Sequence, residues 1–226
     1  MGQFVRTEVL IGKENGDKLK KAKIAVFGLG GVGGHAVEAL ARAGVGHLVL
    51  VDYDSYDITN INRQIGALHS TIGKYKVDVM KERILDINPN AIVETYKPEE
   101  IEGEEINIVD SSFTYVIDAI DTMKNKIKLI EKCKKEKINI ISVTGTANKL
   151  DATKFEITDI YKTSVCPVCK LLRKELKKKN IKNLKVVYSK EETIKLNEAK
   201  TLGSVSYVPS VAGLISAGEV IKDIIK

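Results

Sequence analysis

Gly28-Leu29-Gly30-Gly31-Val32-Gly33 follows the apolar run Ile24-Ala25-Val26-Phe27 directly and precedes a segment with helical spacing of apolar residues. This order predicts a buried strand, a tight turn and a helix. We expect Gly28 to allow the turn, Gly30 to admit a phosphate to the backbone, and Gly33 to let the helix pack on the strand. The helix N-terminus adds partial positive charge where that phosphate would lie. The motif therefore predicts a nucleotide site, and either NAD or ATP could occupy it.

A second apolar run, Leu48–Val51, completes a strand–helix–strand unit and ends at Asp52. A connection of this length favours a right-handed crossover between parallel strands. A carboxylate at the end of the second strand can accept hydrogen bonds from two ribose hydroxyls. Asp52 is therefore the expected ribose ligand.

The alternation of strand and helix patterns continues to Leu150 and predicts an α/β fold, a Rossmann-like, doubly wound and mainly parallel sheet. We expect one domain over residues 1–226, with a nucleotide-binding half at 1–150 and a smaller elaboration at 151–226, packed on the same core, for substrate and dimer contacts. The remaining predicted strands cover residues 91–96, 115–119, 138–144 and 185–188. The predicted helices cover residues 33–43, 74–86, 122–135, 170–179 and 211–224.

Composition limits the functional classes that need to be considered. The chain has 226 residues, of which 43% are hydrophobic, enough for one sizeable core. Its net charge of +6 favours an anionic partner. The sequence has neither a signal-peptide pattern nor an apolar run long enough for a membrane span, and its three cysteines are an odd number. We therefore expect a cytoplasmic protein without disulfides.

Three polar side chains near the predicted strand ends favour ATP over NAD. Arg63 and Lys76 would neutralise a triphosphate and the charge that develops on its α-phosphorus. Asp121 follows a buried strand, at the edge where open α/β sheets bind ligands, and suits Mg²⁺. A dehydrogenase needs no such clamp on a neutral nicotinamide. The alternatives are a surface arginine, a solvated helix lysine and an aspartate that only caps a helix.

These motifs resemble, in order and spacing, those of the ubiquitin-activating-enzyme-like adenylyltransferases, which include ThiF, MoeB and HesA proteins. The shared elements are Gly28-x-Gly30-Gly31-x-Gly33, Asp52-x-Asp54, Asn60-x-Asn62-Arg63-Gln64, Lys76 and Asp118-x-x-Asp121. The resemblance implies an ATP–Mg²⁺ site in which Arg63 and Lys76 hold phosphates and Asp121 binds the metal. The nucleotide-binding set that it implies is Gly28, Gly30, Gly31, Gly33, Asp52, Asp54, Asn62, Arg63, Lys76, Asp118 and Asp121.

The same resemblance implies a homodimer. Members of the superfamily are dimers in which an N-terminal arginine reaches the ATP of the partner. The candidate here is Arg6, within Phe4-Val5-Arg6-Thr7. Together with Arg63, Lys76 and Asp121, it makes up the catalytic set that the resemblance implies.

A narrower resemblance covers nearly the whole chain and is to the branch that dehydrates threonylcarbamoyladenosine in tRNA. It rests on 59–90, including Gly73-Lys74-Tyr75-Lys76, on Asp159-Ile160-Tyr161-Lys162-Thr163, on Val187-Tyr188-Ser189 and on 203–210. It implies ATP-dependent cyclisation of the nucleoside through an adenylylated carboxylate. One alternative is an enzyme that activates the C-terminus of a ubiquitin-like sulfur carrier, and another is an NAD-binding redox protein. A sulfur-transfer partner is also consistent with the resemblance.

Cys166-Pro167-Val168-Cys169 has the spacing of a metal or redox pair. A structural zinc site needs four ligands, and the sequence offers no second pair. The pair also departs from the dehydratase branch, where the second position is usually not cysteine. We favour a structural role and leave open a redox role or a metal site completed across a dimer. Cys133, on a predicted helix, is expected to be a buried apolar residue.

A cluster of basic residues marks the helix predicted over 170–179. The candidate nucleic-acid contacts are Lys170, Arg173, Lys174, Lys177, Lys178 and Lys179. They could form a track for the phosphate backbone of a tRNA stem, or simply a solvated helix face. The resemblance favours the tRNA track.

Overall fold

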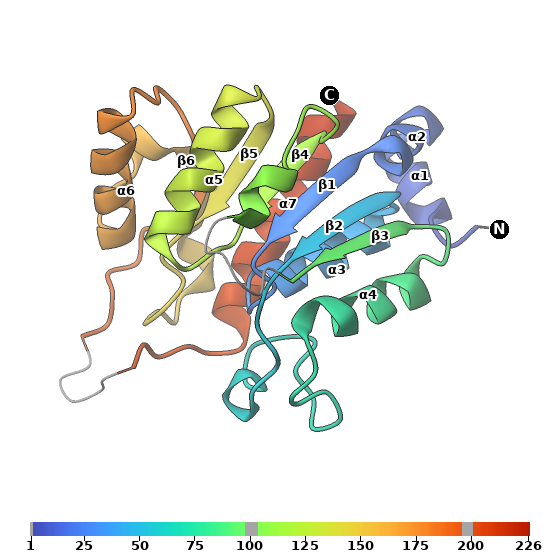
Figure 1. Ribbon diagram of the computed structural model, residues 1–226, viewed down its shortest axis with the longest axis horizontal. Coiled ribbons are helices and arrows are strands. Elements are labelled where there is room, and N and C mark those ends of the chain that lie inside the picture. Colours follow the sequence, from blue (N-terminus) through green and yellow to red (C-terminus); the bar gives the residue numbers. More distant parts are fainter. Residues whose placement is uncertain (1, 98–103, 196–200) are drawn as a thin grey trace.

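The computed structural model describes residues 2–97, 104–195 and 201–226. Its strands are β1 Lys23–Phe27, β2 His47–Val51, β3 Ile92–Tyr96, β4 Tyr115–Asp118, β5 Asn139–Val143, β6 Phe155–Asp159 and β7 Lys185–Ser189. They form one sheet in the order β3-β2-β1-β4-β5-β7-β6, and among these strands only the β6–β7 pair is antiparallel. The order from β3 to β5 can be followed in Figure 1. The expected doubly wound, mainly parallel α/β sheet is confirmed.

The helices cover both faces of this sheet (Figure 1). They are α1 Val5–Ile11, α2 Lys13–Lys21, α3 Gly33–Ala43, α4 Lys76–Ile87, α5 Met123–Lys135, α6 Pro167–Lys178 and α7 Tyr207–Ile225. Short 3₁₀ helices are η1 Ile58–Asn60, η2 Glu104–Ile108, η3 Ala152–Lys154 and η4 Ile160–Lys162. Helices α3, α4 and α7 pack on one face, and α5 and α6 pack on the other. Among the described residues, no helix is both long and apolar enough to cross a membrane.

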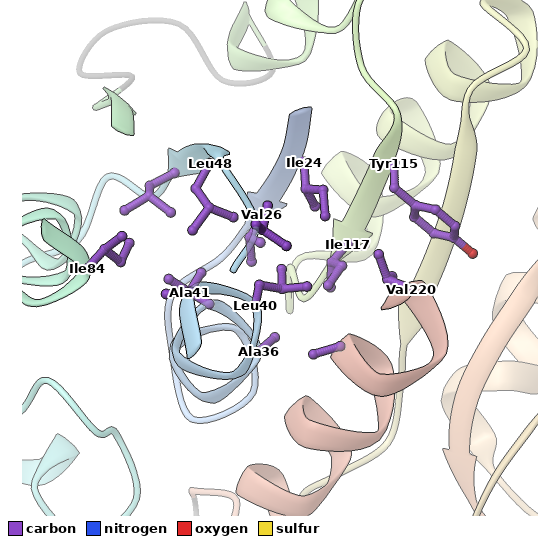
Figure 2. Close-up of a cluster of buried hydrophobic side chains, with 14 of the residues drawn as sticks. Ile24, Val26, Ala36, Leu40, Ala41, Leu48, Ile84, Tyr115, Ile117 and Val220 are labelled. Atoms are coloured by element: carbon purple, nitrogen blue, oxygen red, sulfur yellow. The ribbon is translucent and has the colours of Figure 1, made fainter. Parts of the chain in front are cut away.

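Successive side chains of a strand point to opposite faces of the sheet, so a hydrophobic core forms on each face. In β1, Ile24 and Val26 face α3 and α7, whereas Ala25 and Phe27 face the α5 side. Figure 2 shows the first core, in which side chains of β1, β2 and β4 meet α3, α4 and α7. The central strands are buried on both faces, which explains why they are continuous apolar runs rather than alternating ones.

The C-terminal third extends the same sheet. Strand β7 pairs with β5, and the edge strand β6, which the sequence pattern did not predict, pairs with β7. Helix α7 starts at Tyr207, earlier than predicted, and includes Pro209 in its first turn. Proline is tolerated there because the first amide groups of a helix have no acceptor within the helix. This early start brings Pro209 against Gly31 of the glycine loop.

The order of the strands fixes the position of the site. The chain runs from β1 outward to β2 and β3, and then returns to β4 and β5 on the other side of β1. Ligands of open α/β sheets bind outside the carboxyl ends of the strands at such a switch point. The glycine loop follows β1 and Asp121 follows β4, so both lie at this edge.

Candidate functional site

A cavity of about 550 Å³ opens at the carboxyl ends of β1, β2 and β4. Segments distant in the sequence line it: the glycine loop, the turns after β2 and β4, Thr146 and Ala147 after β5, and residues 202–204 before α7. Of the predicted set, its lining includes Gly28, Gly30, Gly31, Asp52, Asp54, Arg63, Lys76 and Asp121. The structure therefore gathers most of the predicted nucleotide-binding residues around one cavity.

The glycine loop has the backbone geometry that the motif predicts. Gly28 has φ +84°, and a Cβ at this position would lie 2.7 Å from the carbonyl oxygen of Ala119. A Cβ at Gly33 would lie 1.8 Å from the carbonyl oxygen of Gly28. Neither position accommodates a side chain, so the turn closes against β4 and α3 starts directly beneath it. Gly33 does not line the cavity; it allows the close packing that forms the loop.

Asp52 is the buried acid at the end of β2. Its carboxylate accepts hydrogen bonds from the amide of Leu29 at 2.6 Å and from the amide of Asp54 at 2.8 Å. Burial raises the pKa of Asp52 above its usual range, although Lys76 and the two amides act in the opposite direction. The bond to Leu29 ties the second strand to the glycine loop, so Asp52 holds the loop as well as facing the cavity.

Lys76 is the first residue of α4 and is 5% exposed. Its ammonium group lies 2.6 Å from Oδ2 of Asp54 and 3.8 Å from Oδ1 of Asp52. A cation at a helix N-terminus opposes the helix dipole. The two aspartates offset that cost and aim the lysine at the cavity. Asp54, which the family resemblance implies is a nucleotide ligand, is thus the partner that holds Lys76.

Arg63 and Asn62 have different surroundings. The guanidinium of Arg63 donates to the carbonyl of Thr59 at 2.9 Å and to Oδ1 of Asn62 at 2.9 Å, and the residue lines the cavity. Asn62 is not part of the lining; its Nδ2 donates to the carbonyl of Ser204 at 3.0 Å. Asn62 therefore links Arg63 to the segment before α7. Its position supports a positioning role rather than the direct contact expected from the sequence.

The two aspartates of the Asp118-x-x-Asp121 motif differ in their exposure to solvent. Asp118 is fully buried and outside the cavity lining, where it accepts hydrogen bonds from Lys126 at 2.9 Å and from Ser142 at 2.6 Å. It also accepts one from the amide of Ile120 at 3.1 Å, which shapes the turn after β4. Asp121 is exposed and lines the cavity. The structure gives Asp118 an internal partner in Lys126 instead of the expected place beside the nucleotide.

Two buried amides in the cavity lining were not among the predicted site residues. Within the described part of the chain, Oε1 of Gln64 and Oδ1 of Asn125 have no hydrogen-bond partner. The two residues are 7% and 6% exposed. Buried acceptors without partners are costly, which suggests that a ligand supplies the missing donors. Gln64 belongs to the Asn60–Gln64 motif, and Asn125 is one helical turn after Asp121, a spacing that could have revealed it.

Arg6 lies outside the cavity. It is exposed on α1, and Phe4, just before this helix, packs on Gly44 at the C-terminal end of α3. Helix α3 begins at the glycine loop, beyond the carboxyl end of β1, and ends at Gly44, three residues before the amino end of β2. Arg6 therefore does not reach the cavity of its own chain. Contact with a nucleotide would require a second copy of the chain.

The cysteines are all free thiols and buried. Cys166 is the N-cap of α6, and Cys169 lies within the first turn of this helix. Cys133 lies on α5, as predicted. Among the described residues, no three His, Cys, Asp or Glu side chains are grouped as a metal site would require.

The predicted basic helix is α6, but its cations do not form one uniform face. Lys170, Lys174 and Lys177 are exposed, and the ammonium of Lys177 lies over the ring of Tyr161. Lys178 pairs with Glu175 at 2.7 Å, and Lys179 pairs with Glu131 at 2.8 Å. Arg173 is half-buried and donates to the carbonyl oxygen of Thr163 at 3.0 Å and to its hydroxyl. Its position supports anchoring of the preceding turn rather than contact with a nucleic acid.

Comparisons with known proteins agree with this geometry. The ThiF family model matches residues 5–226. A relative from Bacillus subtilis (strain 168), a tRNA threonylcarbamoyladenosine dehydratase, is 46% identical over 241 residues, which cover 99% of this chain and 95% of the relative.

Solved structures of the Escherichia coli tRNA N6-threonylcarbamoyladenosine dehydratase are similar over the same length. Its complex with AMP has a TM-score of 0.92 and 32% identity, over 99% of this chain and 94% of that one. Its complex with ATP has a TM-score of 0.89 and 32% identity, over 99% and 93% of the two chains. The family model spans nearly the whole chain, and most of the motif residues that carry the resemblance line the switch-point cavity. This chain therefore belongs to the ThiF family.

Proposed function

We propose that this chain is an ATP-dependent enzyme that dehydrates threonylcarbamoyladenosine in tRNA through adenylylation of its carboxylate. The observation that carries the proposal is the convergence of Arg63, Lys76 and Asp121 on one cavity beside the glycine loop. The similarity to dehydratases over nearly the full chain supplies the substrate. The complexes of the E. coli relative with AMP and ATP support ATP as the nucleotide.

Each part of the cavity suits one part of ATP. Amides of the glycine loop and the N-terminus of α3 would bind phosphate, and Asp52 would face the ribose hydroxyls. Lys76 would offer its remaining N–H donors to the triphosphate. Arg63 uses one nitrogen for both of its present hydrogen bonds, which leaves further N–H donors for phosphate oxygens.

Asp121 is the residue that would hold Mg²⁺. It is exposed to the cavity, whereas Asp118 is occupied by Lys126. One carboxylate fits this ion, because Mg²⁺ commonly binds one or two carboxylates together with phosphate oxygens and water. When bound, the metal would neutralise phosphate charge during transfer.

The reaction then depends on positioning and charge. The threonylcarbamoyl carboxylate attacks the α-phosphorus and pyrophosphate leaves, which gives an acyl-adenylate. The oxygen of the neighbouring carbamoyl group attacks the activated carbonyl carbon, AMP leaves and a carbamoyl N–H proton is released, so the ring closes with net loss of water. Arg63 and Lys76 would stabilise the charge on the α-phosphoryl group. No step needs a protein nucleophile.

The surface of α6 would contact the tRNA backbone. Cys166, at the start of this helix, lies against Gly145, next to the cavity-lining residues Thr146 and Ala147. The exposed lysines 170, 174 and 177 lie along the same helix and would contact phosphates on tRNA whose modified nucleoside enters the cavity. Because tRNA is the substrate, we place the enzyme in the cytoplasm.

A homodimer would bring Arg6 to the nucleotide of the partner. Helix α1 carries Arg6 together with Val9 and Leu10, which are 82% and 84% exposed. Large apolar side chains exposed on one helix favour burial in an interface. A second copy that covers Val9 and Leu10 would fix the direction of Arg6. The proposed site is therefore completed across the dimer.

Isotope transfer tests the adenylylation step. When the threonylcarbamoyl carboxylate of the tRNA carries oxygen-18, the AMP released should contain one oxygen-18 atom, because that oxygen bridges to phosphorus in the adenylate. AMP without the label would mean that ATP is cleaved by water and would contradict the mechanism. Label transfer from the C-terminus of a sulfur-carrier protein, with none from tRNA, would assign the site to the alternative substrate and a sulfur-transfer pathway.

A further inference from the structure

The pair Cys166 and Cys169 takes no part in the proposed dehydration. Cys166 is the N-cap of α6, Pro167 is the first residue of the helix, and Cys169 lies within its first turn. A Cys-x-x-Cys pair at the start of a helix is typical of thiol redox motifs in reducing compartments. In the described chain they have no partner set for a metal.

Both sulfur atoms pack on the two residues after β5: the Cys166 sulfur lies against Gly145, and the Cys169 sulfur lies 3.1 Å from the hydroxyl of Thr144. The neighbouring Cys169 thiol lowers the pKa of Cys166 below its usual value, against the effect of burial. The amides of Val168 and Cys169 and the ammonium of Lys149 lower it further. The neighbouring Cys166 raises the pKa of Cys169 above its usual value. Cys166, at the N-cap of α6, is therefore the more acidic thiol of the pair.

Cys133 provides an internal contrast. It is also fully buried, but burial raises its pKa to about 12. Its thiol stays protonated and is a poor nucleophile at neutral pH. Burial therefore does not explain the lowered pKa of Cys166, which depends on its position at the start of α6.

We propose that Cys166 and Cys169 form a redox-active dithiol that a peroxide converts to a disulfide. The Cys166 thiolate attacks one oxygen of hydrogen peroxide and becomes a sulfenic acid, while the other oxygen leaves as hydroxide, which takes up a proton. The Cys169 sulfur then attacks the Cys166 sulfur, the S–S bond forms, and hydroxide leaves and takes the Cys169 proton. The dithiol and one peroxide thus give a disulfide and two waters.

The burial of the pair restricts its reaction to a small oxidant. Cys166 is 2% exposed, while its neighbour Val165 is 53% exposed and Pro167 is exposed as well. A peroxide needs far less room at the sulfur than a protein disulfide, which must align three sulfur atoms.

The pair also touches the segment that leads into the nucleotide cavity. The Cys166 sulfur lies 2.6 Å from the place where a Cβ of Gly145 would be, and the hydroxyl of Thr144 lies 3.1 Å from the Cys169 sulfur. Thr146 and Ala147, the next two residues, line the cavity. Closing the disulfide moves both sulfur atoms to a bonded distance of about 2.05 Å. We expect residues 144–147 to shift and ATP affinity to fall at least threefold, an effect that rests on the proposed ATP site.

The oxidation is tested on the full chain by mass spectrometry and does not depend on ATP. One equivalent of hydrogen peroxide should remove two hydrogens from the wild-type mass, and a dithiol reductant should restore them. Cys133→Ala should behave in the same way. Cys169→Ser should instead gain one oxygen at residue 166, because the second step is blocked. No mass change in folded wild-type protein, or a loss of two hydrogens that involves Cys133, would overturn the proposal.

Nucleotide binding is then measured on the same oxidised and reduced samples. Weaker ATP binding in the oxidised wild type, absent in the peroxide-treated Cys166→Ser/Cys169→Ser variant, supports the coupling. A disulfide that leaves ATP affinity unchanged overturns the coupling while the redox site stands. Failure of both forms to bind ATP would contradict the proposed function and not the disulfide.

Discussion

Lys76 and Asp54 form a 2.6 Å ion pair at the first turn of α4, directly at the nucleotide cavity. Asp52 lies 3.8 Å from the same ammonium group, so one lysine is held between two carboxylates. This arrangement stabilises a cation where the helix dipole disfavours one. It also means that loss of the lysine leaves two negative charges beside the proposed phosphates.

Lys76→Ala should weaken ATP binding well over tenfold, because phosphate would lose a cation and face Asp52 and Asp54 unshielded. The measurement is the ATP dissociation constant by calorimetry. Lys74→Ala is the matched control, since Lys74 is exposed two residues earlier. Equal ATP affinity of the two variants would remove Lys76 from the proposed site.

Asp118→Asn should mainly lower stability, whereas Asp121→Asn should mainly lower activity. Asp118 is buried against Lys126, so its loss leaves a buried cation without its counter-charge and should cost about 3–5 kcal/mol of unfolding free energy. Asp121 is exposed, and its substitution should leave stability within about 0.5 kcal/mol while AMP formation falls more than tenfold. Urea unfolding and AMP release measure the two effects. A stable but inactive Asp118→Asn variant would contradict this division.

Much of the site could be predicted because its glycines and charged residues follow apolar strands. The run before Gly28 and the run before Asp52 fix two neighbouring strand ends, and parallel pairing brings those ends together. Spacing alone could not separate Asp121 from Asp118, because both stand at the end of β4. Only the packing of Lys126 on Asp118 makes one internal and leaves the other in the cavity.

Other features depend on tertiary contacts that no local pattern encodes. Edge strand β6 is half-buried throughout, so it lacks a clear alternation. The cavity wall formed by Thr146, Ala147 and residues 202–204 comes from segments brought together only by the complete sheet. Arg173 resembles its lysine neighbours in sequence, and its distinct role emerges from the nearby Thr163 carbonyl.

Charge reversal on α6 tests the tRNA surface. The triple variant Lys170→Glu, Lys174→Glu and Lys177→Glu should weaken tRNA binding and reduce the slope of log affinity against log salt by about one for each phosphate that the helix no longer binds. The triple variant Lys13→Glu, Lys20→Glu and Lys21→Glu on α2 changes the net charge equally and serves as control. Identical salt slopes in the two variants would show that α6 is only a solvated face.

Ionised Asp223 should stabilise the fold at neutral pH, and this contribution to the free energy of unfolding should be lost in acid. Burial would raise its pKa, but hydrogen bonds from Lys185, Lys226 and Tyr115 outweigh burial and lower the pKa to about 2. The stabilisation is therefore present above the unfolded value of about 3.9 and is lost as pH falls towards 2. Asp223→Asn should lose about 1–3 kcal/mol at pH 7, with the difference from wild type narrowing as pH falls through this window. A constant difference at all pH values would contradict the assigned linkage.

The most direct test of the central claim is AMP release by the purified protein with tRNA that carries threonylcarbamoyladenosine, followed by mass analysis of the nucleoside. We predict AMP formation only with the modified tRNA, and a nucleoside product lighter by one water. AMP formation that is the same with unmodified tRNA, or a nucleoside of unchanged mass, would contradict the assignment as a tRNA dehydratase.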